Sequence, residues 1–592
     1  MQNNKKDYSK LNPEELLKVI EKLESHKKYG LVWDEEKTKE QFEKESKNAL
    51  PVLKEVKGKE IKTDPAKPTN ILIEGDNYHA LSVLNYTHQG KIDVIYIDPP
   101  YNTGNRTWKY NNDYVEREDA YKHSKWLTFV SKRLRLAKNL LKDEGIIIVT
   151  IDDYEVFQLG MLMDEIFGEE SRLGVITVLN KKSGRTTDKF FATCHEYYFV
   201  YARNPLLAKI NNFTLNEDQI REYRYKDDTS QYKWRDFLRT GGFSTPKERP
   251  NSFYPIYFDE VTNNISIKPT KNGIKILPID SKGNERVWRQ TRPSLELLIQ
   301  RGDIKIEKNR LGKYSVRIKD RIKEGIKPKT VWDNPRYDAA THGTKLLENI
   351  LGEAKVFDFP KSLYAVVDAL KITSPNKKDA IIVDFFAGSG TTGHAVLELN
   401  KEDGGNRQFI LCTNNELNGL EKELREKGLS EKEIQEHGIC KGVTYPRIEK
   451  VIKGYKNSNG LKITGLGGNL KYYKTAFVKN SISRDDLKIS ITRECTEMLC
   501  LREGIFDEVK AKPDYHIFEQ NGKIMAIYYA LERDGLEQLK KEMDKMKGEK
   551  ILYCFTLDPL GLNKNDFIDW QGVSLEPIPQ KILDIYEQIY EY

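Results

Sequence analysis

The sequence predicts an α/β fold with a doubly wound, mostly parallel sheet, and three observations support this prediction. Short β-branched runs alternate with longer amphipathic stretches between residues 69 and 203, as expected for consecutive βαβ units. The same alternation returns at Ala380 after a long interruption. In each half, an apolar run ends in a turn made of prolines or glycines, and ligands bind at such strand ends in open α/β sheets.

The first half can be followed element by element. Residues 69–84, TNILIEGDNYHALSVL, predict a strand, a glycine-containing turn and a helix. The apolar run IDVIYI at 92–97 predicts the next strand, parallel to the first because a helix connects the two. Beyond it we expect a helix at 119–142, a strand at 145–153, a helix at 154–167, and strands at 174–180 and 195–203.

The alternation stops at about residue 205 and resumes after about residue 340, which predicts an inserted domain. Basic residues in this insert are interleaved with aromatic ones, a mixture that suits a nucleic-acid surface but also occurs on ordinary surfaces. The candidate DNA-binding residues are Lys226, Arg235, Arg239 and Arg249. We expect five regions: an N-terminal helical region at 1–65, halves of the α/β domain at 66–204 and 341–453, the insert at 205–340 and, after a glycine-rich linker at 454–469, a small C-terminal α/β domain at 470–592.

The composition argues against several classes of protein. At 592 residues, the chain is long enough for several domains. No apolar run approaches the roughly 18 residues of a membrane span, and the N-terminal stretch lacks the apolar core of a signal peptide, so we expect a cytoplasmic protein. The six cysteines form no C-x-x-C pair, so we expect neither a metal site nor disulfides. The net charge of +7 permits a polyanionic partner without requiring one.

The first chemical motif is Asp98-Pro99-Pro100-Tyr101. Asp98 falls at the carboxyl end of a predicted strand, and the two prolines stiffen the turn that follows. A carboxylate, rigid backbone carbonyls and an aromatic ring then meet at one point. This combination suits a flat base with an amino group, because the ring can stack on the base while two oxygens accept its N–H bonds. The alternative is a strand stopped by prolines and followed by an ordinary turn.

The second motif, DFFAGSGTT at 384–392, follows an apolar run and opens a helix. A glycine turn lets a ligand approach the backbone there, and the helix N-terminus favours an anionic group. The lysine of a phosphate-binding P-loop is missing, whereas the spacing of Gly388, Gly390 and Gly393 fits a dinucleotide fingerprint. Candidates for the acidic residue that binds a ribose in such sites are Glu402, Asp403 and, just past the next predicted strand, Glu416.

The two motifs together separate these options. A nicotinamide enzyme needs no D-P-P-Y at a second strand end, whereas an enzyme that methylates an amino nitrogen needs both parts. With D-P-P-Y at 98–101 and F-x-G-x-G at 386–390, the sequence resembles the DNA amino-methyltransferases. The order of the motifs around the insert resembles the beta class, and the aspartate form points to adenine. Residues 123–153, 343–353 and 357–363 resemble the modification subunits of Type III restriction-modification systems, as does the C-terminal extension.

The resemblance implies a Rossmann-like, S-adenosylmethionine-dependent fold and a role for each motif residue. Asp98 and the Pro99 carbonyl would accept hydrogen bonds from the adenine amino group, Pro100 would complete the turn, and Tyr101 would stack on the flipped base. The implied cofactor-binding residues are Asp76, Lys361, Asp384, Phe386, Gly388, Ser389, Gly390, Thr391 and Glu416. Asp76 would meet the adenine ring of the cofactor and Glu416 its ribose. The alternatives are that Asp76 only caps a helix and that Glu416 is a surface acid. No metal is implied.

The resemblance therefore implies a site-specific DNA adenine-N6 methyltransferase, most simply the modification subunit of a Type III system. The expected partners are double-stranded DNA, a second copy of the chain and a separate helicase-nuclease subunit, and the expected location is the cytoplasm. The competing interpretations are a free-standing methyltransferase, a non-catalytic DNA-binding module and, more distantly, a dehydrogenase. The recognition sequence cannot be read from the residues.

Overall fold

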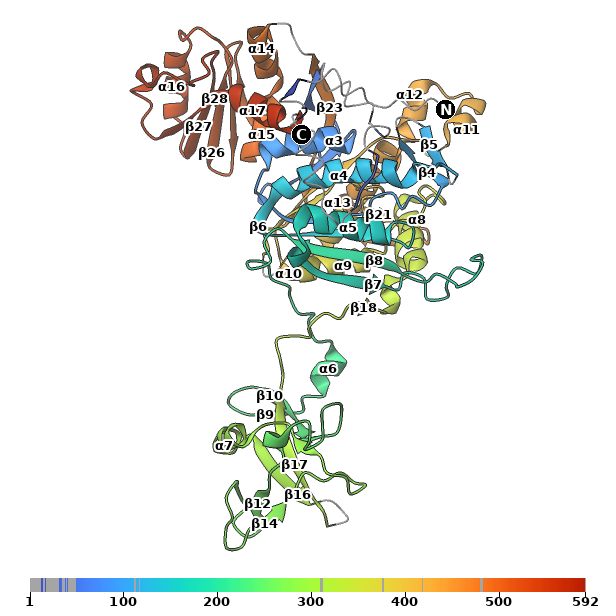
Figure 1. The fold of residues 1–592 in the computed structure, drawn as a ribbon. Coiled ribbons are helices and arrows are strands. Elements are labelled where there is room, and N and C mark those ends of the chain that lie inside the picture. The colour runs from blue at the N-terminus through green and yellow to red at the C-terminus, as the bar shows by residue number, and fades with distance from the viewer. Residues whose placement is uncertain are drawn as a thin grey trace. The chain divides into compact units, whose positions relative to one another are not determined.

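The computed structural model describes residues 49–590 apart from 111–112, 117, 309–311, 375–376, 418 and 480–482, and also positions 12, 13, 16, 31–34, 38 and 40. Most of the helical region predicted at 1–65 therefore lies outside the described residues. The chain divides into two compact units. The inserted unit is Asn212–Pro328, and the main unit contains the rest of the chain. Each unit is drawn in Figure 1.

A ten-stranded sheet forms the centre of the main unit. Its strand order is β1 (Ala49–Glu55), β23 (Asn469–Lys479), β2 (Thr69–Glu74), β20 (Gln408–Thr413), β19 (Ile381–Asp384), β3 (Ile92–Ile97), β6 (Leu141–Ile151), β8 (Glu196–Ala202), β7 (Arg172–Val178) and β18 (Val331–Trp332). Neighbouring strands are parallel except where β1 meets β23 and where β8 meets β6 and β7. The predicted doubly wound, mostly parallel α/β fold is thereby confirmed.

The sheet is wound in two directions from its middle. From β3 the chain runs through α4 (Lys122–Leu140) to β6, whereas from β19 it runs through α10 (Thr391–Asp403) to β20 on the other side. Because such crossovers are right-handed, the two directions place their helices on opposite faces. One group contains α3 (Asn77–Thr87), α4 and α5 (Val156–Phe167); the other contains α9 (Leu363–Thr373), α10 and α13 (Tyr445–Lys453). Figure 1 shows both groups against the sheet.

Burial on both faces explains the composition of the middle strands. All six residues of β3 are buried, as are the last three of β19. Parallel strands covered by helices on both faces are expected to read as continuous apolar runs rather than alternating ones. This is why both strands were recognisable in the sequence without their neighbours.

Two strands of the central sheet lie where the sequence predicts something else. β1 lies inside 1–65, for which we predict helix, and it pairs antiparallel with β23. β23 begins at the boundary predicted for a separate C-terminal domain, but it belongs to the central sheet between β1 and β2. The 454–469 stretch, predicted as a linker, contains the hairpin of β21 (Gly454–Lys456) and β22 (Lys462–Thr464). For β1 and β23, pairing partners far away in the sequence, rather than local patterns, determine the strands.

The C-terminal part of the main unit has its own five-stranded sheet. Its order is β24 (Glu508–Ala511), β25 (Tyr515–Gln520), β26 (Lys523–Tyr528), β27 (Glu549–Phe555) and β28 (Val573–Ile578). Helices α14 (Arg484–Glu494), α15 (Thr496–Glu503), α16 (Leu536–Asp544) and α17 (Gln580–Tyr590) accompany it. Both α15 and α17 pack against α3, and the Tyr586 hydroxyl donates a hydrogen bond to the Pro51 carbonyl of β1. This part is therefore anchored on the central sheet.

The inserted unit is built of small antiparallel sheets around an aromatic core. Its largest sheet has the order β16 (Ile304–Lys308), β17 (Tyr314–Arg321), β10 (Gln231–Asp236) and β9 (Tyr225–Lys226). Phe237 and Trp288 stack in the core with ring centroids 5.5 Å apart, and Tyr254 is 1% exposed. Within the described parts of both units, no helix is long and apolar enough to cross a membrane.

Candidate active site

The two sequence motifs meet at the point where the winding of the sheet reverses. Asp98 directly follows β3 and Asp384 ends β19, and these two strands are parallel neighbours. A crevice forms at such a switch point because the adjacent connections leave in opposite directions. A cavity of about 90 Å³ lies there. Its lining residues are Tyr96, Asp98, Phe357, Phe359, Pro360, Lys361, Asp384, Phe386, Ala387, Gly388, Ser389, Thr391 and Thr392.

The Asp98 carboxylate is held by one of its two oxygens. The Thr150 hydroxyl donates to Oδ1 at 2.6 Å, and the Lys361 ammonium lies 3.2 Å from the same oxygen. Among the described residues, both of these contacts are made to Oδ1, and the side chain remains 28% exposed at the cavity. The arrangement fixes the carboxylate plane while Oδ2 is available to a ligand.

Residues outside the D-P-P-Y motif hold the proline turn after Asp98 in place. The Trp126 indole N–H of α4 donates a 2.6 Å hydrogen bond to the Pro100 carbonyl. The half-buried Tyr101 places its hydroxyl within 3.3 Å of the Thr150 hydroxyl and 3.1 Å of Glu196 Oε2, and it also contacts Lys361. Burial and the nearby carboxylates hold the pKa of Tyr101 well above its usual range, so its hydroxyl keeps its proton at neutral pH.

A second buried carboxyl supports the residue that follows Tyr101. Asn102 has a left-handed backbone with φ of +56°, and its amide donates to Glu155 Oε1 at 2.5 Å and to the Lys122 carbonyl at 3.2 Å. His123 Nδ1 lies 2.6 Å from the same Glu155 oxygen. Burial raises the pKa of Glu155 to about 8, against the opposing hydrogen bond from Asn102. Glu155 thus fixes a strained position next to the motif.

Lys361, predicted as a cofactor residue, lines the cavity but directs its ammonium to the D-P-P-Y side. Its Nζ contacts Asp98, Glu196 and Tyr101 and lies 4.5 Å from the centroid of the Tyr101 ring. Burial lowers the pKa of Lys361, but the carboxylates of Asp98 and Glu196 outweigh that effect and raise it. The lysine is therefore a cation held between two carboxylates.

The glycine motif forms a tight loop before α10. Gly388 and Gly390 have φ of +47° and +76°, which disfavour any residue with a Cβ. A Cβ on Gly388 would also lie 3.0 Å from the Phe357 ring. The Arg447 guanidinium of α13, fully buried, donates to Ser389 and Thr391, and the Thr444 hydroxyl donates to the Gly388 carbonyl at 2.6 Å. Burial lowers the pKa of Arg447 to about 9.

Asp384 stabilises this loop by accepting hydrogen bonds from two of its residues. Its Oδ1 accepts a hydrogen bond from the Phe386 N–H at 2.9 Å, and its Oδ2 accepts one from the Thr392 hydroxyl at 2.5 Å. Burial raises the pKa of Asp384 to about 7. Both carboxylate oxygens are used inside the loop, while the Phe386 side chain lies beside Phe129 of α4 at 5.8 Å between ring centroids.

Asp76 and Glu416 lie at the same edge of the sheet, but neither lines the 90 Å³ cavity. Asp76 caps α3 by accepting a hydrogen bond from the Tyr78 N–H at 2.7 Å, and the buried Arg133 guanidinium lies 3.4 Å from its Oδ2. Glu416 follows β20 and accepts a hydrogen bond from the Asn414 amide at 2.5 Å. The helix-capping alternative for Asp76 is thus present in the structure, and its side chain is still 43% exposed.

Sequence reasoning missed the residues that hold the motifs in place. These supporting residues are Trp126, Arg133, Thr150, Glu155, Glu196, Thr444 and Arg447. Most of them lie on helices or strands that are predicted from other, apolar residues, so the supporting residues themselves carry no signal in the sequence. Glu196 is the exception, since an acid directly before the aromatic run of β8 is an unusual start for a buried strand.

In the inserted unit, the structure gathers two of the four predicted DNA-binding residues. Arg235 (β10) and Arg239, in β11 (Leu238–Arg239), lie close enough to Arg289 that, after burial, they contribute to lowering its pKa. Lys226 is exposed on β9, and Arg249 precedes the short helix at Pro250–Ser252. We call Arg235, Arg239 and Arg289 the arginine cluster; the carboxylates of Asp236 and Asp320 also act on Arg289 and oppose the lowering of its pKa.

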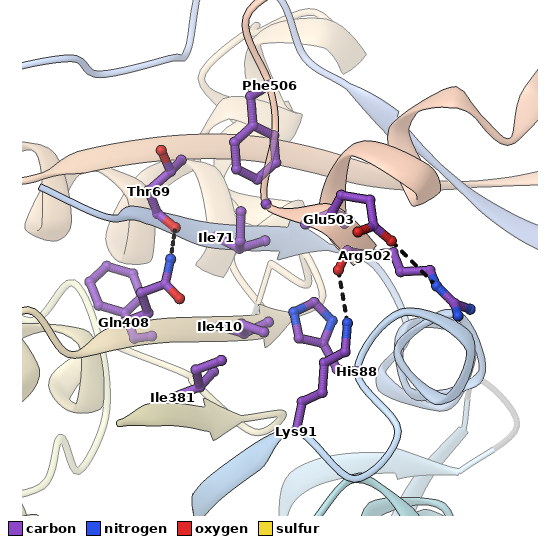
Figure 2. A pocket seen from close by; sticks show the side chains of 13 residues that line it. Thr69, Ile71, His88, Lys91, Ile381, Gln408, Ile410, Arg502, Glu503 and Phe506 are labelled. Atoms are coloured by element: carbon purple, nitrogen blue, oxygen red, sulfur yellow. Dashed lines mark hydrogen bonds and ion pairs between the residues drawn. The ribbon is translucent and has the colours of Figure 1, made fainter. Parts of the chain in front are cut away.

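A second cavity, of about 180 Å³, lies at the opposite strand ends (Figure 2). It is lined by the first residues of β2, β19 and β20 and by the end of α15. The Lys91 ammonium donates to the Arg502 carbonyl at 2.8 Å, and burial lowers the pKa of His88 to about 3. Although it is larger, this cavity contains neither motif, and its lysine is already used to join α15 to the sheet.

Comparing the sequence with known proteins gives one matching family and several relatives. A family described as DNA methylase matches residues 92–417. The Type II methyltransferase M.KpnI of Klebsiella pneumoniae is 37% identical over 348 residues, 58% of this chain and 79% of that one. The type III EcoPI Mod subunit of Escherichia phage P1 is 33% identical over 418 residues (65% and 62%). The StyLTI Mod subunit of Salmonella typhimurium is 28% identical over 438 residues (69% and 60%).

The chain thus spans slightly less than two thirds of the length of these two Mod subunits. The matched region begins with β3 and ends just past β20, so it contains the D-P-P-Y turn, the inserted unit and the glycine loop. The resemblance read from the two motifs is confirmed. This chain belongs to the DNA methylase family.

Proposed function

We propose that this protein transfers a methyl group from S-adenosylmethionine to the N6 amino group of an adenine in double-stranded DNA. The observation that carries the proposal is that Asp98 and the glycine loop line the same cavity. A methyl donor and an amino acceptor have to meet within bond-forming distance, and a shared cavity at a switch point provides that meeting place.

The residues around the cavity fit the cofactor. Gly388, Ser389 and Thr391 of the glycine loop line the cavity, and the N-terminus of α10, which favours an anionic group, follows directly. Gly388, Ser389, Thr391 and Phe386 would hold its methionine part, with Glu416 toward the ribose and Asp76 toward the adenine ring. When bound, S-adenosylmethionine supplies an activated methyl group on a sulfonium.

The D-P-P-Y residues would prepare the amino group. Asp98 Oδ2 and the Pro99 carbonyl would accept its two N–H bonds, which concentrates the nitrogen lone pair away from the ring and toward the methyl group. Tyr101 would stack on the flipped base and recover part of the few kcal/mol needed for extrusion, since stacking contributes about 1–3 kcal/mol per base. As the nitrogen takes up the methyl group, the proton that it loses would pass to Asp98 Oδ2.

The finer assignment is the modification subunit of a Type III restriction-modification system. Two of the relatives named above are Mod subunits of such systems, which supports it. M.KpnI, a Type II methyltransferase, supports the free-standing alternative. The inserted unit would be the target-recognition domain, and the C-terminal sheet would serve dimerisation or partner docking. The homodimer, the separate restriction subunit and the cytoplasmic location stay predictions.

The proposal is tested with Asp98→Ala and Asp98→Asn in cells that lack other adenine methylation. The wild-type gene should introduce N6-methyladenine at one sequence, mapped genome-wide, and both variants should abolish it while purified protein still binds S-adenosylmethionine and DNA. Methylation at cytosine, or full methylation by Asp98→Ala, would contradict the proposal. Affinity purification of the wild-type protein then distinguishes the two assignments: a co-purified helicase-nuclease supports Type III, and its absence supports a free-standing enzyme.

A further inference from the structure

Glu196 is a buried carboxylate next to the reacting groups that no motif includes. It is the first residue of β8, which lies beside β6 with its first residues at the carboxyl end of that strand. Only 4% of the residue is exposed. Its Oε2 lies 2.5 Å from Lys361 Nζ and 3.1 Å from the Tyr101 hydroxyl. A buried carboxylate is expensive unless paired, so the pairing with Lys361 is what permits Glu196 there.

Lys361 connects this buried acid to the motif. The same ammonium that contacts Glu196 lies 3.2 Å from Asp98 Oδ1, and its side chain is 10% exposed. Asp98 therefore shares one counter-ion with Glu196. Without Glu196, the lysine charge would be balanced by Asp98 alone and would draw that carboxylate toward itself. With Glu196, the lysine is anchored on the side away from the cavity.

This anchoring bears on which oxygen of Asp98 is open to a ligand. Thr150 and Lys361 both contact Oδ1. A lysine that moved freely could also reach Oδ2 and compete with an amino group for it. Glu196 does not line the cavity, whereas Lys361 and Asp98 do, so Glu196 can act on a ligand only through its two neighbours, Lys361 and Tyr101.

We infer that Glu196 is a positioning residue for methyl transfer, which holds the Lys361 ammonium on Asp98 Oδ1 so that Oδ2 receives the amino group. The inference rests on the proposed function and adds to it a residue that touches neither substrate nor cofactor.

The first test is Glu196→Gln, which keeps the shape and an acceptor oxygen for the Tyr101 hydroxyl but removes the charge. We expect the single-turnover rate of methyl transfer to fall about 10- to 100-fold, the loss typical of a small misplacement of reacting groups. The dissociation constants for S-adenosylmethionine and DNA should stay within about twofold of wild type. Glu170→Gln, at an exposed residue of the short helix Glu169–Ser171, is the matched control and should behave as wild type.

The second test asks whether Glu196 acts through Lys361. Lys361→Met leaves two neighbouring carboxylates without their cation, so this variant should be slow and less stable. Adding Glu196→Gln removes one of these charges. The double variant should therefore be no slower than Lys361→Met and should unfold at a higher temperature. If Lys361→Met alone fails to fold, the double variant can still be compared with Glu196→Gln.

Three results would overturn the inference: a wild-type rate for Glu196→Gln, a loss of cofactor affinity as large as the loss of rate, or rate losses that multiply in the double variant. Each of these is read against an active wild-type enzyme. A wild-type protein that transfers no methyl group to adenine would instead contradict the proposed function, so the two failures are distinguishable.

Discussion

The Thr150 hydroxyl of β6 donates a 2.6 Å hydrogen bond to Oδ1 of Asp98, which directly follows the neighbouring strand β3. Thr150 is fully buried, so this donor is not replaced by water. Thr150→Val keeps the branched shape and removes the donor. A hydrogen bond to a charged group is worth about 1.5–3 kcal/mol, so we expect methyl transfer to slow by about one to two orders of magnitude. Single-turnover kinetics at saturating cofactor would measure this, and an unchanged rate would show that Asp98 does not depend on Thr150.

Gly388→Ala should weaken cofactor binding more than it weakens the fold. The new methyl group would lie 3.0 Å from the Phe357 ring at the cavity wall, at a φ of +47°. Gly404→Ala is the control, because its φ of +67° imposes similar strain in open space at the end of α10. Both variants should lose about 1–2 kcal/mol of unfolding free energy. Only Gly388→Ala should raise the dissociation constant for S-adenosylmethionine in calorimetric titrations; equal effects at both positions would remove the loop from the cofactor site.

Glu155 should make the stability of the protein depend on pH. Burial raises its pKa from 4.5 to about 8, so between these values the folded protein keeps a proton that the unfolded chain has lost. Stability therefore falls as the pH rises through this window, by at most about 1.4 kcal/mol per unit. Glu155→Gln removes the effect. In scanning calorimetry, the melting temperature of this variant should therefore rise relative to that of the wild type as the pH increases from 5 to 8.

The control for this experiment is Glu169→Gln, because Glu169 is 78% exposed. Its melting temperature should follow the wild type at every pH. If the Glu155→Gln variant also follows the wild type, the carboxyl at Glu155 is ionised in the folded protein.

The arginine cluster should contribute to DNA affinity through phosphates. Arg235→Gln combined with Arg239→Gln should weaken binding and reduce the slope of log affinity against log salt by about 0.9 for each lost phosphate contact. Arg221→Gln is the control in the same unit, because Arg221 is already paired with Glu217 and Asp218. Fluorescence anisotropy across a salt series gives both slopes. Equal slopes for the double variant and the control would place the DNA surface elsewhere.

The parts of the site that could be predicted lie in short, continuous segments of the sequence. Asp98 was recognisable because an apolar run and two prolines define its place, and Asp384 because glycines follow an apolar run. That β3 and β19 are neighbours was not predictable from either segment, because it depends on the order in which the sheet is wound. The helix that the second motif opens begins at Thr391, directly after the left-handed Gly390.

The supporting residues could not be predicted for a related reason. Glu196 and Lys361 are joined only in the folded chain, and Arg447 reaches the glycine loop from a helix that follows β20. Charged side chains are usually at the surface, so no local pattern predicts that Glu196 pairs with Lys361 or that Arg447 is buried beside the glycine loop. Similarly, β1 is followed by charged residues, and it becomes a strand through its pairing with β23.

The place of β23 between β1 and β2 limits how the protein can be shortened. A fragment cut to the family match at 92–417 would keep both motifs but lose β1, β2 and β23. The peptide groups of β20 that pair with β2 would then be exposed along an apolar edge, and open edges of this kind recruit strands from other molecules. Shortened forms of this protein should therefore keep every strand of the central sheet, from β1 through β23, and should not end where sequence similarity begins and ends.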